Sequence, residues 1–112
     1  MTLCTVLVGS LHWTVTVEEG LREREKCVGI TDCSTLTVRL DAEHCRHPEQ
    51  LRLTLAHELT HALDYERDLH LSEHKADQIG AGWAALLEAN RAVLGPLLLP
   101  EASALPPTLP SA

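Results

Sequence analysis

Two histidines and a glutamate occur at helical spacing in the segment LAHELTHALDY, residues 55–65. His57 and His61 are four residues apart, so on a helix their side chains leave one face a turn apart and could bind one metal ion. Glu58 lies about 100 degrees round the helix from His57. It is therefore poorly placed to be a third ligand, but it could reach a water molecule beside the ion. The segment is a complete H-E-x-x-H pattern.

This pattern is typical of metal-dependent hydrolysis. Zinc lowers the pKa of a bound water molecule to about 7, and a carboxylate such as Glu58 can then remove its proton as the general base. The same residues could instead belong to a metal-free helix. However, the pattern lies in the apolar run 53–63, where buried imidazole and carboxylate groups without partners would be costly in desolvation free energy. The sequence therefore favours a metal site.

A catalytic zinc site usually has three protein ligands and leaves a fourth position to water. The longer pattern H-E-x-x-H-x-x-G-x-x-H is excluded, because Asp64 and Arg67 stand where it needs glycine and histidine. The segment SEHKAD, residues 72–77, instead places Glu73 and Asp77 four residues apart, on one face at the start of a second predicted helix. The third ligand is expected downstream of the first helix.

The E-x-x-x-D spacing resembles that of the thermolysin-like glutamate zincins, in which the glutamate binds zinc and the aspartate hydrogen-bonds a ligand histidine. The resemblance implies that Glu73 is the third ligand and that Asp77 supports His57. His70 and His74 remain alternative ligands, and Glu73 could simply be a carboxylate that is favourable at a helix N-terminus.

Two further side chains on the first helix could border the site. Asp64 and Tyr65 lie about 20 and 80 degrees round the helix from His57. Tyr65 could donate a hydrogen bond to an oxyanion that develops in the transition state, or its phenol could anchor the end of the helix.

Three strands are predicted to support these residues. Residues 3–17 alternate between apolar and polar side chains on both sides of Gly9-Ser10, which predicts a hairpin. Residues 34–41 alternate in the same way and predict a third strand. Trp13, on the apolar face of the hairpin, is expected to anchor the core together with Trp83.

Two helices are predicted to follow the strands. Pro48 and the leucines spaced every four residues from Leu51 to Leu63 predict a helix from about 48 to 66. Ser72 can cap a second helix, from about 72 to 94, that would end at Gly95-Pro96. Its predicted inward stripe consists of Ala76, Ile79, Trp83, Leu86, Leu87 and Leu94.

The length of 112 residues permits one modest core, so we expect a single α+β domain over residues 1–97. Residues 98–112 are rich in proline and are expected to be disordered. The four cysteines include no C-x-x-C pair, so free thiols, mostly buried, are expected.

The ordered combination of motifs resembles the small zincin-like metallopeptidases common in phages and prophages and, more loosely, phage metallopeptidases that cleave repressors. The resemblance rests on LTVRLD, HELTHALDY and EHKAD, and covers residues 28 to about 90. It implies a minimal zincin fold, with a small twisted sheet packed on the active-site helix and a second helix that supplies the third ligand. One departure is the short connection of 11 residues between His61 and Glu73.

The resemblance implies a zinc-dependent peptidase whose substrate binds in extended form along an edge strand, which would be the strand at 34–41. Zinc would be held by His57, His61 and Glu73, with Glu58 as the general base. Manganese or nickel could substitute for zinc. The alternative is a catalytically weak or inactive, zinc-stabilised module that binds a phage or host protein.

The charge and hydropathy of the chain narrow the range of partners. A net charge of -7 with only nine lysines and arginines argues against nucleic acid. No apolar stretch reaches the roughly 18 to 20 residues that span a bilayer, and the N-terminal residues do not resemble a signal peptide. We therefore expect a cytoplasmic protein that does not bind membranes. If a phage encodes the protein, its location would be the cytoplasm of the host cell.

Overall fold

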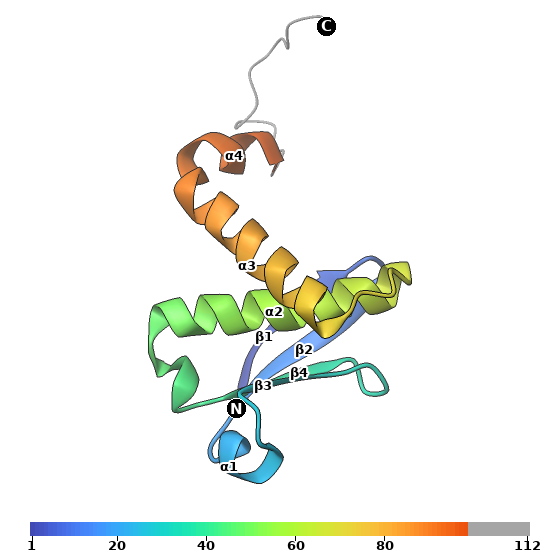
Figure 1. Ribbon diagram of the computed structural model, residues 1–112, viewed down its shortest axis with the longest axis vertical. Helices are drawn as coiled ribbons and strands as arrows, with labels where there is room; N and C mark the ends of the chain where they lie inside the picture. Colours follow the sequence, from blue (N-terminus) through green and yellow to red (C-terminus); the bar gives the residue numbers. More distant parts are fainter. Residues whose placement is uncertain (99–112) are drawn as a thin grey trace, which may run out of the picture.

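A sheet of four strands forms one layer of the protein, and the long helix α2 (Pro48–Arg67) lies across it, as Figure 1 shows. Helix α3 (Glu73–Ala89) crosses α2, and α4 (Arg91–Leu98) follows at the far end of α3. This computed structural model describes residues 1–98. The α+β class predicted from the sequence is confirmed.

The sheet is mixed, with the strand order β1-β2-β4-β3. The strands are β1 (Thr2–Val8), β2 (Leu11–Glu18), β3 (Gly29–Asp32) and β4 (Thr37–Asp41). The first two strands form the predicted hairpin, which turns at Gly9-Ser10 with Gly9 in the left-handed region at φ 60°. The pair β2–β4 is parallel and the pair β3–β4 is antiparallel.

The prediction of a three-stranded sheet was wrong in two respects. The sequence analysis missed β3, because four residues that begin with glycine are too few to show a clear alternation. The strand predicted at 34–41 begins only at Thr37, and it lies between β2 and β3. The strand at 34–41 is therefore not an edge strand and cannot take up an extended substrate. In the described part of the chain, the edges of the sheet are β1 and β3.

The predicted helix at 48–66 is confirmed as α2, with Pro48 in its first turn and Asp68, at φ 54°, as its C-cap. Ser72 caps α3 as predicted, because its hydroxyl oxygen accepts a hydrogen bond from the Lys75 backbone N–H at 3.1 Å. Two short helices, α1 (Leu21–Glu25) and a single 3-10 turn (His44–Arg46), connect the other elements.

The second predicted helix does not continue to residue 94. It ends at Ala89, and its C-cap is Asn90, whose side-chain amide donates a hydrogen bond to the Leu86 carbonyl at 3.0 Å. Helix α4 then starts at Arg91 and passes through Gly95-Pro96 to Leu98. Pro96 lies near the end of this short helix, where it removes only one backbone donor and does not stop the helix.

The core lies between the sheet and α2. Its fully buried side chains include Trp13 and Val15 from β2 and Val38 and Leu40 from β4, as predicted for the apolar faces of these strands. The leucine stripe of α2 is only partly buried: Leu51 and Leu55 pack against the core, whereas Leu63 is 43% exposed. The buried residues of this helix are Thr54, Ala56, Glu58, Thr60 and Ala62. Because α2 is covered by the sheet and by α3, burial does not follow one stripe.

The predicted inward stripe of α3 was also wrong. Of its six members only Ala76 is buried, and Ile79, Leu86 and Leu87 are each more than 40% exposed. Helix α3 meets α2 over its first half, and its second half extends away from the body of the protein (Figure 1). The close contact is made at Gly80, where an added Cβ would lie 3.0 Å from the His57 Cα. Trp83, the second predicted core anchor, is only half-buried.

The cysteines, the hydropathy of the helices and the end of α4 bear on three further predictions. All four cysteines, which lie within residues 1–98, are unpaired, but only Cys45 is buried. No helix among the described residues has both the length and the apolar character needed to cross a membrane. Leu98, the first residue of the predicted disordered segment, is the last residue of α4, and residues 99–112 lie outside the described residues.

Candidate metal centre

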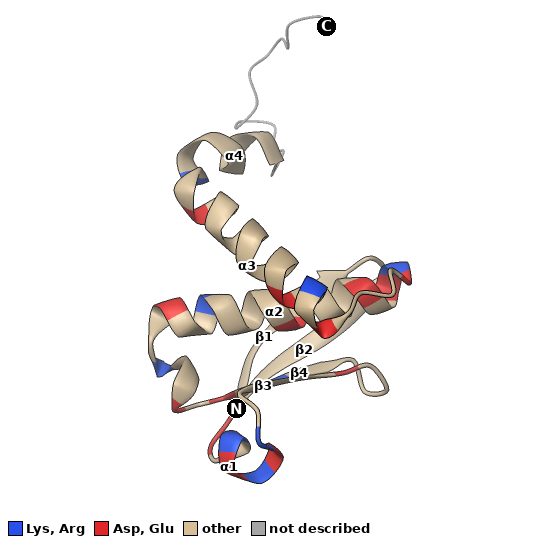
Figure 2. Ribbon diagram, in the orientation of Figure 1, with Lys and Arg blue, Asp and Glu red and all other residues tan. Residues whose placement is uncertain are grey.

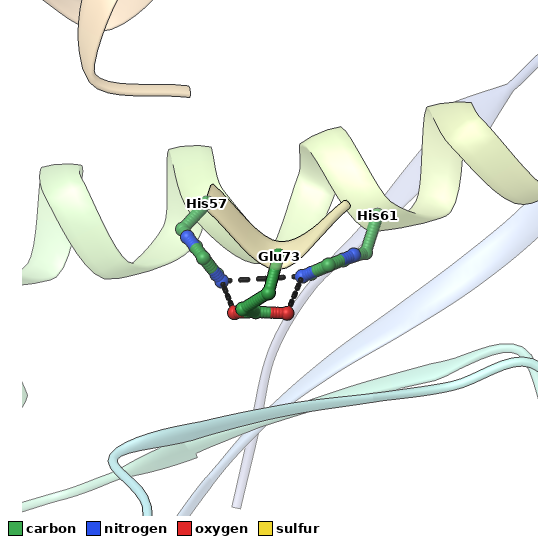
Figure 3. Close-up of side chains that lie close together, drawn as sticks. All are labelled: His57, His61 and Glu73. Atoms are coloured by element: carbon green, nitrogen blue, oxygen red, sulfur yellow. Dashed lines mark hydrogen bonds and ion pairs between the residues drawn. The ribbon is translucent and has the colours of Figure 1, made fainter. Parts of the chain in front are cut away.

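Three side chains from α2 and α3 converge on one point, as Figure 3 shows. The Nε2 atoms of His57 and His61 are 3.2 Å apart. The carboxylate of Glu73 spans them, with Oε1 2.7 Å from His57 Nε2 and Oε2 3.0 Å from His61 Nε2. The structure thus brings together the three residues predicted as metal ligands.

The positions of these ligands follow from local helix geometry and from one close helix contact. The four-residue spacing on α2 places both imidazoles on the same face, with ring centroids 4.8 Å apart. Glu73 is the first residue of α3. Helix α3 is held near His57 by the close approach at Gly80 and by the Trp83 indole, which donates a hydrogen bond to the Thr60 hydroxyl at 3.0 Å.

The donor atoms fit a zinc ion in number and type, and they lie close enough together to hold one. One ligand atom from each residue can be chosen so that all lie within 4.8 Å of one another. Ligand atoms of a tetrahedral zinc with bonds of about 2.0–2.1 Å lie roughly 3.3 Å apart, close to the separation of the two histidine nitrogens. Two imidazoles and one carboxylate are also the donor set of one class of catalytic zinc sites. Glu73 is 74% exposed, so the site is open on that side.

Asp77 lies behind the cluster, one turn after Glu73. Its Oδ1 is 3.4 Å from the Nδ1 of His57, the ring nitrogen that faces away from the other ligands. A carboxylate at this nitrogen favours the tautomer that leaves Nε2 free to bind a metal. The position suits the supporting role that the resemblance implied for Asp77.

Glu58 lies beside the cluster and is almost fully buried, with 6% of its surface exposed. Its Oε2 is 3.9 Å from His57 Nε2. Its Oε1 accepts a hydrogen bond of 2.7 Å from the hydroxyl of Thr31 in β3. The carboxylate thus lies between the edge strand and the ligand cluster.

A cleft of about 650 Å³ contains the cluster and is bordered by β3 and by the C-terminal half of α2. Asp64 and Asp68 line it in addition to Glu58 and Glu73, and among the described residues no lysine or arginine does. Figure 2 shows several acidic residues at the start of α3 and at the end of α2, with basic residues among them in both segments. Burial, with Asp32 and Asp64 nearby, raises the pKa of the Cys33 thiol in the cleft, so this thiol stays neutral and adds no charge. Because carboxylates line the cleft and no lysine or arginine of the described residues neutralises them there, the cleft favours a cation.

The other candidate side chains lie outside the cluster. Tyr65 lines the cleft, and its ring packs edge-on against Trp13 with centroids 6.1 Å apart, so it both anchors the helix and borders the site. Asp64 lines the cleft, where its Oδ2 accepts a hydrogen bond from the Leu71 backbone N–H at 3.2 Å.

The two alternative ligands lie apart from the cluster. His70 lines the cleft, with its Nε2 3.2 Å from Oδ1 of Asp68, and His74 is exposed on α3. Neither histidine belongs to the ligand cluster.

Sequence reasoning missed three residues that position the site. Thr31 and Gly29 both lie in β3, the strand that was not predicted, and both touch Glu58. Gly80 was overlooked because the apolar residues around it dominated the pattern of α3. The pair Gly80 and Gly82 within a helix was the available signal, since glycine there is unfavourable unless close packing requires it.

The comparisons with known proteins add nothing to this geometry: the chain matches no protein-family model, no curated protein and no solved structure.

Proposed function

We propose that this chain is a zinc-dependent peptidase, with His57, His61 and Glu73 as the zinc ligands and Glu58 as the general base. The observation that supports the proposal most is the convergence of the three donor groups beside a buried carboxylate that is not itself a ligand. A site built only to stabilise the fold would have a closed set of four ligands. Here three protein donors leave room for water and substrate.

Each residue has a defined part in the reaction. Zinc in this site would polarise the substrate carbonyl and lower the pKa of the attacking water. Glu58 takes a proton from that water as the new C–O bond forms, and the O–H electron pair stays with the water oxygen. Glu58 then gives the proton to the amide nitrogen as the C–N bond breaks. Tyr65, which borders the cleft, would donate a hydrogen bond to the carbonyl oxygen as its negative charge develops.

The substrate in this proposal is a peptide in extended form. Strand β3 is an edge of the sheet, and its residues Gly29, Ile30 and Thr31 line the cleft. An edge strand can add a further strand through its free backbone groups. In this proposal the substrate therefore binds along β3 and not along the strand at 34–41.

The proposal also includes the minimal zincin fold and the cytoplasmic location inferred from the sequence, within the host cell if a phage encodes the protein. Two features support the zincin fold: the layered arrangement of the sheet, α2 and α3, and the origin of the proposed ligands on two successive helices.

A second function is favoured by the openness of the site. Glu73 is 74% exposed, and the short connection between α2 and α3 adds little wall to the cleft. A zinc-stabilised module that binds a phage or host protein without appreciable turnover would share these features. Both functions require zinc, so metal content does not separate them.

Peptide cleavage separates them. A diverse peptide mixture is incubated with the wild-type protein and with Glu58→Gln, each with and without a chelator, and the products are identified by mass spectrometry. The proposal predicts cleavage by the zinc-loaded wild type alone, and zinc content equal in both proteins. Equal cleavage by Glu58→Gln would contradict the mechanism, and no cleavage by either protein would favour the binding module.

A further inference from the structure

We propose that Thr31 is a positioning residue for the general base: it holds Oε1 of Glu58 so that Oε2 faces the metal ligands and the attacking water. This inference rests on the proposed function, because it assigns a role within that reaction. It concerns a residue in an edge strand, 27 positions away from Glu58 in the sequence.

The contact involves two atoms of Glu58. The Thr31 hydroxyl lies 2.7 Å from the carboxylate Oε1 and 3.0 Å from the backbone carbonyl oxygen of the same residue. Its single hydrogen is donated preferentially to the ionised group, because hydrogen bonds to charged acceptors are stronger. The hydroxyl therefore lies between the carboxylate of Glu58 and the backbone of the same residue. Its hydrogen bond to the carboxylate limits rotation of the Glu58 side chain, which has three rotatable bonds.

The backbone of β3 restricts the carboxylate further. A Cβ added at Gly29 would lie 2.8 Å from Glu58 Oε2 and 2.9 Å from its Cγ, so the strand backbone passes close to this side chain and leaves no room for a larger residue at position 29. Thr31 and Gly29 thus border the same carboxylate, one through a hydrogen bond and the other through the lack of a side chain. Together they restrict the orientation of the carboxylate.

This orientation distinguishes the two oxygens. Oε1 is engaged by Thr31, whereas Oε2 lies 3.9 Å from His57 Nε2 and accepts no hydrogen bond from a residue in the described part of the chain. In the proposed reaction the O–H bond of the attacking water breaks and the new O–H bond forms at Oε2. Thr31 can keep its bond to Oε1 throughout, so the base need not reorient before it delivers the proton to the leaving nitrogen.

Kinetics of variants test this role against a purely structural one. Thr31→Val keeps the shape but removes the hydroxyl, and Thr31→Ser keeps the hydroxyl. We expect Thr31→Val to lower kcat about 10- to 100-fold, as for a misplaced catalytic group, with KM and zinc content unchanged. Thr31→Ser should recover most of the loss. Thr37→Val, the same change in β4 at a hydroxyl that donates to the Thr35 carbonyl, is the control and should behave as wild type.

A second measurement does not depend on activity. Melting temperatures are compared for chelator-treated wild type, Thr31→Val, Glu58→Leu and the double variant. We expect Thr31→Val to lower the melting temperature more when Glu58 is present than when leucine replaces it.

The outcomes separate the two proposals. An unchanged kcat in Thr31→Val, a loss that Thr31→Ser does not recover, or additive melting shifts would overturn the role of Thr31 in an active enzyme. A wild-type protein that cleaves no peptide but shows coupled melting shifts would overturn the proposed function, and the positioning role with it, while the contact itself stands.

Discussion

Two buried carboxylates lie in different regions of this protein and differ in how many of their oxygens accept hydrogen bonds. Asp41, at the end of β4, is 2% exposed and both of its oxygens are engaged: Oδ1 accepts the Arg22 backbone N–H at 3.0 Å and Oδ2 accepts that of His44 at 2.9 Å. Glu58, in the cleft, is 6% exposed, and only its Oε1 accepts a hydrogen bond from a described residue.

The difference separates a structural carboxylate from a reactive one. The donors around Asp41 belong to α1 and to the 3-10 turn that follows β4, so its charge joins these two segments to the end of the strand and is compensated by them. In Glu58 one oxygen accepts no hydrogen bond from the described residues, and burial of a carboxylate with so few hydrogen-bond donors is unfavourable for stability. Such a cost in a folded protein is characteristic of groups that bind or react.

Glu58→Gln should give the largest effect. It removes the general base, so peptide hydrolysis should fall about 10²- to 10⁴-fold. Its free energy of unfolding should remain unchanged or rise, because a buried charge is lost. Parallel measurements of kcat and of urea unfolding test both parts, and a large loss of stability would show that Glu58 is structural like Asp41.

Asp41→Asn should give the reverse result. Replacing one oxygen by an amide that cannot accept a hydrogen bond should lower the free energy of unfolding by about 1.5–3 kcal/mol, the value of one hydrogen bond to a charged group. The kcat of the folded fraction should be that of wild type. Urea unfolding at neutral pH provides the measurement, and a stability equal to wild type would contradict the assignment.

The stability that Asp41 provides should also depend on pH. The backbone hydrogen bonds from Arg22 and His44 lower the pKa of this carboxyl below 3.8 in the folded protein. Its contribution is therefore complete above the unfolded-state pKa of about 3.9 and is lost as the pH falls through the folded-state pKa. The gap in unfolding free energy between wild type and Asp41→Asn should narrow below about pH 4. A gap that stays constant there would exclude this linkage.

Gly80→Ala should affect the metal site and leave the Asp41 region intact. Its Cβ would lie 3.0–3.1 Å from the α2 backbone at Ala56 and His57, so α3 would have to shift, at a cost of about 1–3 kcal/mol in stability. Zinc affinity should fall because Glu73 moves with α3.

Gly82→Ala is the matched control for this change on the same helix. Its added Cβ meets nothing within 4 Å, so it should raise stability by about 0.4–1 kcal/mol and leave zinc affinity unchanged. Thermal unfolding and zinc titration of both variants make the comparison. Equal effects of the two substitutions would show that the helix contact does not hold the site.

Asp77→Asn should give the smallest change. Asp77 is 65% exposed and acts through His57, so zinc affinity should fall about tenfold, the lower end of the range for groups that support a ligand. Competition with a chelator of known affinity measures the change. An affinity equal to wild type would remove Asp77 from the site.

The sequence predicted the parts of the site that depend on local geometry. Helical spacing alone places His57 and His61 on one face, and Ser72 marks the start of α3. The choice of Glu73 over His70 and His74 came from the resemblance to the glutamate zincins and not from local geometry. The partner of Glu58 could not be inferred, because Thr31 reaches it only through the packing of a four-residue edge strand on α2.

The buried faces of the helices were mispredicted for a related reason. Periodicity identifies an inward stripe when a helix is covered from one side. Helix α2 is covered by the sheet and by α3, so small residues such as Ala56 and Ala62 are buried and Leu63 is exposed. Helix α3 packs over its first half alone, which leaves Leu86 and Leu87 exposed despite their apolar character.

Calorimetric titration of the chelator-treated protein with zinc tests the proposed metal site directly. We expect one zinc site per chain in the wild type, loss of that site in His61→Ala and in Glu73→Gln, and binding equal to wild type in His70→Ala, because His70 lines the cleft outside the cluster. Absence of stoichiometric binding in the wild type, or binding unchanged by His61→Ala and Glu73→Gln, would contradict the proposed metal site.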